Sequence, residues 1–128
     1  MSSKNTMSNK KIGNETEKEF VQIAYENGYW AHILDTKITG QPFDVIMAKD
    51  ELAWFLDVKH VADKDYLLHS RIEENQINAF KMLLKRNVMR IGFVIKFENH
   101  GWYYLPFYKI DLTKNKTHMD DMFPLPMK

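Results

Sequence analysis

Apolar residues recur along the chain with two different periods, and these periods divide it into predicted helices and strands. The first helical pattern covers residues 14–27, where Asn14 with Glu17 three positions later is typical of a helix start and Gly28 of a helix stop. The apolar residues that follow a 3.6-residue spacing there are Phe20, Val21, Ile23, Ala24 and Tyr25. We therefore predict an amphipathic helix over residues 14–27.

Shorter apolar runs predict the strands of one sheet. Residues 29–34 are rich in aromatic and β-branched side chains, and they lead into a loop at 35–42 that carries Thr, Gly and Pro. Two further runs, 43–48 and 52–60, are separated by three polar residues, which is short enough for an antiparallel hairpin. We expect all three strands to lie in the same sheet.

A second helical pattern begins at Ser70, which has the capping-box spacing to Glu73. Its apolar stripe continues to about Arg86 and consists of Ile72, Ile77, Ala79, Phe80, Leu83 and Leu84. Residues 90–97 and 102–108 are then typical of a second hairpin.

The order helix, three strands, helix, two strands predicts an α/β fold with a mixed five-stranded sheet flanked by helices. A chain of 128 residues that is 45% hydrophobic fits one domain. Residues 1–12 are rich in Ser, Asn and Lys and predict a flexible N-terminal arm. We expect the domain to cover residues 13–110 and a partly ordered C-terminal tail to cover 111–128.

Composition limits which side chains could bind a metal, but it does not identify a binding partner. The chain has no cysteine, so a metal would be held by oxygen or imidazole ligands. Its 18 Lys and Arg and 17 Asp and Glu give a net charge of +1, which neither requires nor excludes a polyanionic partner. No apolar run has the roughly 20 residues of a membrane span, and the polar start lacks a signal-peptide core, so we expect a cytoplasmic protein without a membrane partner.

Glu17 occupies a position where the first helix is otherwise apolar. It shares a helix face with Phe20, Val21 and Ala24, which would aim its carboxylate at the sheet. The alternative is a capping-box glutamate that folds back on the amide of Asn14. Spacing alone leaves both interpretations open.

Three charged residues interrupt the apolar runs of the first predicted hairpin. Asp44 lies between a phenylalanine and a valine, and Asp57 and Lys59, two positions apart, share one face of the next strand. A structural ion pair near a strand end, or exposure at a sheet edge, would explain one such pair. Burying a charge is unfavourable by several kcal/mol unless a partner or a metal compensates it, so three charges together favour a functional site.

Gln76 turns an amide towards the apolar face of the second helix, although a buried glutamine bonded to backbone is an alternative explanation. Several carboxylates without cysteine form an oxygen site suited to Mg²⁺ or Mn²⁺, which also bind phosphate oxygens. A neighbouring lysine can orient a metal-bound water and offset the negative charge of a phosphoryl transition state. These are the components of a phosphodiesterase. The residues that suggest one polar pocket are Glu17, Asp44, Asp57, Lys59 and Gln76.

Residues 42–44 (Pro-Phe-Asp), followed after twelve residues by 57–59 (Asp-Val-Lys), resemble the signature of the PD-(D/E)XK nuclease superfamily. Residues 13–17 resemble the glutamate-bearing first helix of Holliday junction resolvases of the archaeal Hjc and bacterial RecU types. Residues 73–76 resemble the RecU helix that carries a glutamine after the motif lysine. The resemblance extends over about residues 13–110.

This resemblance implies a restriction-endonuclease-like core and a metal-dependent, structure-selective endodeoxyribonuclease. The implied enzyme is a Holliday junction resolvase of the kind that phages and bacteria carry, which hydrolyses phosphodiester bonds in paired symmetric nicks as a homodimer with Mg²⁺ or Mn²⁺. Two alternatives stay open: a repair or restriction-type nuclease acting on duplex DNA, and a non-catalytic DNA-binding protein with the same fold.

The resemblance also implies a role for each site residue. Lys59 would be the catalytic lysine, and Gln76 would position it or contact the scissile phosphate. The implied metal ligands are Asp44, Asp57, the backbone carbonyl of Val58 and, directly or through a bound water, Glu17.

Basic residues gather in one part of the chain. Residues 75–97 hold five basic residues and no acidic one. Such residues could bind DNA phosphates without reading sequence, although they could also form the solvated side of an amphipathic helix. The residues that we expect to contact DNA are Lys81, Lys85, Arg86, Arg90 and, from the arm, Lys11.

Overall fold

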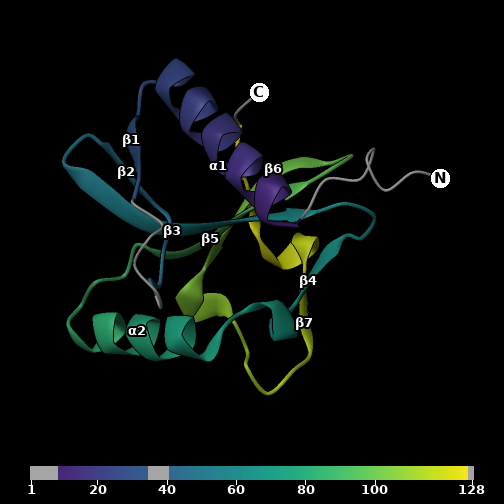
Figure 1. The fold of residues 1–128 in the computed structure, drawn as a ribbon. Coiled ribbons are helices and arrows are strands. Elements are labelled where there is room, and N and C mark those ends of the chain that lie inside the picture. The colour runs from purple at the N-terminus through teal and green to yellow at the C-terminus, as the bar shows by residue number, and fades with distance from the viewer. Residues whose placement is uncertain (1–8, 35–40, 127–128) are drawn as a thin grey trace.

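A mixed sheet lies between two helices, which cover its opposite faces (Figure 1). The computed structural model describes residues 9–34 and 41–126, and within these ranges it contains a six-stranded sheet and the helices α1 (Asn9–Glu26) and α2 (Glu74–Lys85). Only β3 and β5 pair in parallel among the neighbouring strands of this described sheet. In sheet order the strands are β1 (Trp30–Ile33), β2 (Val45–Lys49), β3 (Leu52–Val61), β5 (Ile91–Phe97), β6 (Gly101–Pro106) and β8 (Phe123–Pro124).

The core consists of two apolar layers, one on each side of the central strands β3 and β5. On one side, Phe20 of α1 packs with Val58 and Val94; on the other, the ring of Phe80 of α2 meets that of Phe93 edge-on. Because both faces are covered, β5 is an almost continuous apolar run rather than an alternating one. The predicted strands at 29–34, 43–48, 52–60, 90–97 and 102–108 are all confirmed to within a few residues.

Helix α1 begins at Asn9, five residues before the predicted start at Asn14. Half-buried Ile12 extends the inward face formed by Thr16 and Phe20, and the Thr16 hydroxyl donates to the Ile12 carbonyl at 2.7 Å. The predicted flexible arm is therefore wrong for residues 9–12, and residues 1–8 lie outside the described ranges. No helix within those ranges is both long enough and apolar enough to cross a lipid bilayer.

The predicted capping box at Ser70 is wrong. Ser70 lies in a short 3-10 helix, η2 (His69–Arg71), and α2 starts only after Ile72 and Glu73. The backbone of Ile72 is extended, with φ −94° and ψ 119°, because its side chain is buried in the core under α2. This buried isoleucine divides the predicted continuous helix into two.

The C-terminal segment adds a sixth strand to the five that were predicted. Strand β8 pairs with β6, and a second small sheet joins β4 (Tyr66–Leu68) to β7 (Lys116–His118). Buried Met122 anchors the segment in the core, and the ring of His69 bonds to Thr117 Oγ1 at 2.6 Å. Two further 3-10 helices, η3 (Phe107–Lys109) and η4 (Met119–Asp121), connect these strands. The tail is folded because it covers one end of the apolar layer.

The close approach of β5 and β6 at Gly92 makes a testable prediction. A Cβ atom at position 92 would lie 2.3 Å from the Leu105 carbonyl oxygen and 2.9 Å from the Cα of Pro106. Since these are backbone atoms of a paired strand, we expect Gly92→Ala to lower the free energy of unfolding by about 3 kcal/mol in urea denaturation.

Gly13 supplies the matched control, because a Cβ there meets nothing within 4 Å. We expect Gly13→Ala, inside α1, to raise the free energy of unfolding by about 0.5–1 kcal/mol. A Gly92→Ala protein that unfolds at the urea concentration of the wild type would contradict the described packing of β5 on β6.

Candidate active site

The pairing of β2 with β3 brings Asp44 and Asp57 together. The last pair of the ladder is Val45 with Leu56, and Asp44 and Asp57 are the next residues of the two chain segments. The Asp44 amide donates to the carbonyl of Leu56, the residue already opposite Val45, at 2.9 Å, so the regular ladder ends here. A hydrogen bond joins the side chains of Asp44 and Asp57, so two carboxylates distant in sequence become neighbours.

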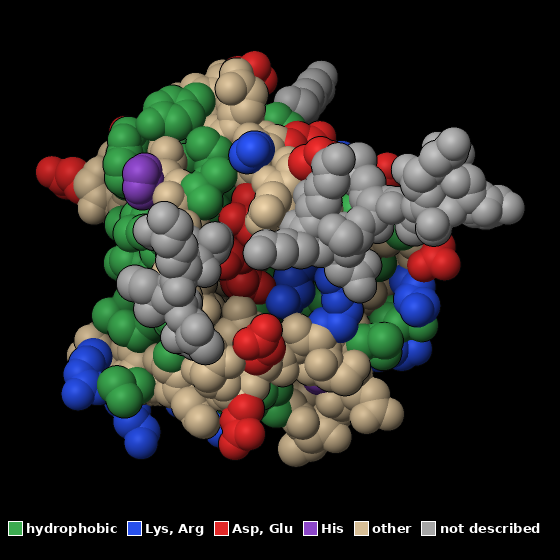
Figure 2. Space-filling model, in the orientation of Figure 1, with side chains coloured by type: hydrophobic (Ala, Val, Ile, Leu, Met, Phe, Trp, Pro, Cys, Tyr) green, Lys and Arg blue, Asp and Glu red, His purple; other side chains and the backbone are tan. Residues whose placement is uncertain are grey.

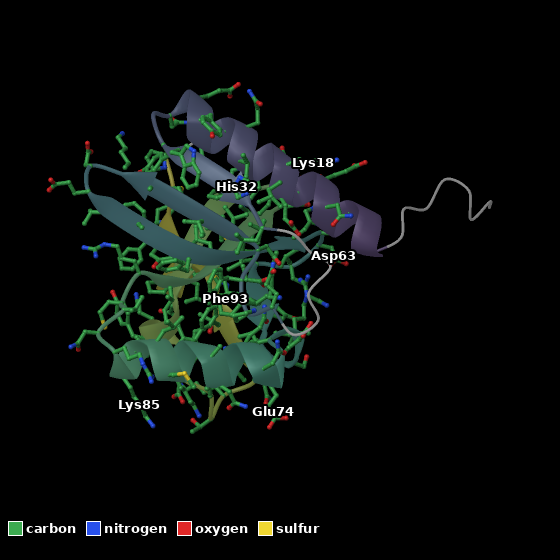
Figure 3. All side chains as sticks on the ribbon, turned by 60° about the vertical axis from the view of Figure 1, so that its left-hand side comes forward. Lys18, His32, Asp63, Glu74, Lys85 and Phe93 are labelled. Atoms are coloured by element: carbon green, nitrogen blue, oxygen red, sulfur yellow. The ribbon has the colours of Figure 1, made fainter. Side chains whose placement is uncertain are left out.

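Lys59 lies on the same face of β3 as Asp57, and its Nζ is 2.8 Å from Asp57 Oδ2. The Lys59 side chain is only 13% exposed and that of Asp57 7%, so this is not an ion pair in open solvent. Lys59 Nζ also lies 5.6 Å from the centre of the Phe93 ring on β5 (Figure 3 labels Phe93). Strand and core together hold the ammonium beside the carboxylate.

Glu17 reaches the same place from α1. It is 8% exposed; burial raises the pKa of its carboxyl group to about 7, and the charge of Asp57 contributes to the rise. Asn14 lies inside α1 rather than at its start, so Glu17 is not a capping residue of the predicted kind. The structure thus decides between the two interpretations in favour of the inward-facing carboxylate.

The carboxyl group of Asp44 has a more strongly raised pKa than that of Glu17. Burial raises the pKa of Asp44 to about 9, and a hydrogen bond with Asp57 together with the charges of Asp57 and Glu17 acts in the same direction. The amide of Val58, 3.4 Å from Asp44 Oδ2, opposes the rise. Acidic side chains accordingly appear near the centre of one face of the molecule with basic side chains beside them (Figure 2).

The donor chemistry of this cluster fits a hard divalent cation. Asp57 Oδ2 is buried and has no hydrogen-bond partner among the described residues, although Lys59 Nζ lies close to it. When fully ionised, as cation ligands are, the three carboxylates carry more negative charge than this one ammonium neutralises, and oxygen is the ligand that Mg²⁺ and Mn²⁺ prefer. In the described conformation no three acidic or imidazole groups already surround a common cation position, since Asp57 is turned towards Lys59.

Gln76 faces inward as predicted and is 4% exposed. Its Nε2 donates to the Pro42 carbonyl at 3.2 Å, and its Oε1 accepts from the Glu73 amide at 3.2 Å. The amide therefore ties the first turn of α2 to the segment that leads into Asp44. Its predicted contact with Lys59 or with a phosphate stays a prediction.

Four of the predicted DNA-binding residues lie in the second half of α2 or after it. Lys85 lies at the opposite end of α2 from Glu74 (Figure 3), nine positions and about 14 Å along the helix from Gln76. Lys96, from the same basic segment, is engaged by Glu19 of α1 at 2.8 Å. The side chain of Lys11 lies outside the described part. The exposed residues at or beyond the far part of α2 are Lys81, Lys85, Arg86 and Arg90.

Arg71, which the sequence did not single out, lies beside Lys59. It lines a cavity together with Lys59 and His60, and its Nη1 donates to the His60 carbonyl at 2.8 Å. A single arginine in a polar connection carries no periodic signal, so only the folded chain reveals its position.

Comparison with known proteins shows which fold carries this site. No protein-family model and no curated protein sequence matches the chain. The structure is similar to that of Hjc, a Holliday junction resolvase from the archaeal hyperthermophile Archaeoglobus fulgidus. The TM-score is 0.68 over 88% of this chain and 95% of Hjc, with 12% sequence identity. The chain has the fold of Hjc. The predicted resolvase-type α/β core is thereby confirmed, with six strands in its described sheet in place of five.

Repulsion among the clustered carboxylates predicts that Asp44→Asn stabilises the metal-free protein. The same substitution should remove the stabilisation that metal gives the wild type. In metal-free buffer at pH 10, above the raised pKa of Asp44 of about 9, Asp44→Asn removes one negative charge from the cluster, and we expect the free energy of unfolding to rise by about 1 kcal/mol. Millimolar Mg²⁺ or Mn²⁺ should raise the melting temperature of the wild type by roughly 3 °C and leave that of Asp44→Asn unchanged.

Thermal unfolding followed by fluorescence measures both effects. Asp121→Asn, which removes an exposed carboxylate from η4, is the control and should keep the full metal response. An equal response of Asp44→Asn and the wild type to metal would exclude Asp44 from the binding site.

Proposed function

We propose that this protein is a metal-dependent, structure-selective endodeoxyribonuclease that resolves four-way DNA junctions by paired symmetric nicks. The observation that carries the proposal is the meeting of Glu17, Asp44 and Asp57 with Lys59 at the centre of a fold shared with a Holliday junction resolvase. Fold alone does not determine activity, so the proposal depends on the chemistry of these four side chains.

The carboxylates are the cation-binding part of the proposed site. Asp44 and Asp57, with the backbone carbonyl of Val58, would hold one Mg²⁺ or Mn²⁺, and Glu17 would bind it directly or through a water molecule. Bound there, the cation would supply Lewis-acid activation of the phosphate and lower the pKa of water. Asp57 Oδ2 supports this assignment, since it is buried without a hydrogen bond and the ammonium of Lys59, 2.8 Å away, is shared with a cluster of three carboxylates.

Lys59 is the residue that we place at the reacting phosphate. The ammonium would donate hydrogen bonds to the attacking water or to a phosphate oxygen and would offset the negative charge that develops there. Its contact with Phe93 and its 13% exposure keep water from screening this charge. Gln76 would act indirectly. Its hydrogen bond to the Pro42 carbonyl would hold the segment that leads into Asp44.

Paired nicks at a four-way junction require two active sites related by symmetry. We therefore infer a homodimer, because a two-fold axis places identical sites on opposed strands. A solution measurement of mass with and without junction DNA tests this part of the proposal independently of cleavage.

The decisive experiment compares three labelled substrates, a four-way junction, a linear duplex and a single strand, with Mg²⁺ or Mn²⁺. We expect the wild type to nick the junction in opposed pairs, and Asp57→Ala and Lys59→Ala to cleave it at least roughly 100-fold more slowly. Asp121→Ala should cleave like the wild type. Circular dichroism confirms that each variant is folded.

Each other outcome selects a different function. Cleavage of all three substrates would favour a repair or restriction-type nuclease. Tight binding without cleavage would favour a non-catalytic DNA-binding protein. Wild-type activity of Asp57→Ala would place the reaction elsewhere on the molecule.

A further inference from the structure

A hollow beside Lys59 is formed by three segments that lie far apart in the sequence. Ile12 and Gly13 of α1 form one wall, and Lys59 and His60 of β3 form another. Arg71 of η2 completes the hollow, and its exposed side chain also lines a second hollow with Asp63 and Lys64. Arg71 thus lines two depressions, one of which contains the proposed catalytic lysine.

Arg71 and Asp44 both bond to backbone groups of β3 beyond its last pair with β2. Strand β2 pairs with β3 only as far as Leu56, and beyond that point the described residues place no strand on this edge. Asp44 accepts from the Val58 amide here, and Arg71 donates to the His60 carbonyl at 2.8 Å. Two residues of a strand span about 7 Å, so the guanidinium lies about that far beyond the Asp44 carboxylate along the same edge.

The charge of Arg71 is available to a ligand. One of its N–H groups is used by the His60 carbonyl, and no ion pair joins it to a carboxylate among the described residues. A guanidinium has five N–H donors in a planar fork that matches the oxygens of a phosphate, so further donors remain for an anion. An arginine that served only to brace η2 would need neither exposure nor these free donors.

We propose that Arg71 binds a backbone phosphate of the cleaved DNA strand, adjacent to the scissile phosphate at Lys59. This inference rests on the proposed function for the position of the scissile phosphate. The contact fixes the strand along the open edge of β3, so that the phosphate to be cleaved lies over Asp44 and Asp57.

Binding in metal-free buffer tests the contact without cleavage. Fluorescence anisotropy of a labelled junction gives the dissociation constant at several KCl concentrations for wild type, Arg71→Gln, Arg71→Lys and Lys114→Gln. We expect Arg71→Gln to bind roughly 10-fold more weakly and to lower the slope of log K against log salt by about 1. Arg71→Lys keeps its charge and should retain the slope while losing part of the affinity.

Lys114→Gln is the charge-matched control, since Lys114 is exposed in the segment before β7, where only its backbone carbonyl bonds to His69. It should keep the wild-type slope and bind within about twofold of wild type. A merely structural Arg71 would lower the melting temperature of Arg71→Gln and leave the salt slope unchanged, which would overturn the inference.

Cleavage locates the phosphate on the strand. Junctions that carry one neutral methylphosphonate at each position flanking the cut should include one that slows the wild type roughly 10-fold and does not slow Arg71→Gln further. A uniform response of both proteins at every position would overturn the inference.

The failures of the two proposals are distinguishable. A wild type that cuts junctions while Arg71→Gln binds and cuts equally well would leave the nuclease and remove the Arg71 contact. A wild type that binds with an Arg71-dependent slope but cuts nothing would leave the contact and remove the nuclease. A wild type that binds no DNA would overturn both.

Discussion

The pairing of β2 with β3, which ends beside Asp44 and Asp57 and so brings them together, is the constraint on which the site depends. It is fixed by apolar burial on the reverse face of the same strands, where Val45 and Leu56 are both 0% exposed under α1. A slip of one residue would turn every side chain of β2 to the other face and bury Asp44 against α1. The core therefore sets the register, and the register brings the carboxylates together.

Without a bound cation, the cluster of carboxylates lowers the stability of the folded protein. Burial and the charge of Asp57 raise the pKa of Glu17 and Asp44, so ionising these carboxyls is unfavourable until a bound cation offsets their charge. The two apolar layers around β3 and β5 supply the compensating stability. Sites built in this way gain function at the expense of stability.

The two helices α1 and α2 contribute to the site in different ways. α1 contributes a carboxylate directly through Glu17, whereas α2 contributes the bonds of Gln76 that fix the approach to Asp44. η2 comes before α2 because Ile72 is drawn into the core, and this break is what brings Arg71 to the edge of β3. A local packing requirement thus determines which cation stands beside Lys59.

Sequence alone determined the strands, the inward face of α1 and the set of misplaced charges. Buried strands and amphipathic helices are encoded by the spacing of apolar residues, and a charge inside an apolar run is conspicuous without any coordinates. Asp44, Asp57, Lys59, Glu17 and Gln76 were found in this way, and the structure brings the first four together and ties the last to the same loop.

Tertiary structure decided whatever depends on contacts between distant segments. The start of α1 at Asn9, the interruption at Ile72 and the sixth strand β8 follow from burial against partners that no local window contains. The same holds for Arg71, whose position beside Lys59 depends on where β2 stops pairing with β3. Periodicity reports which side of an element is buried, whereas the fold alone fixes what lies against it.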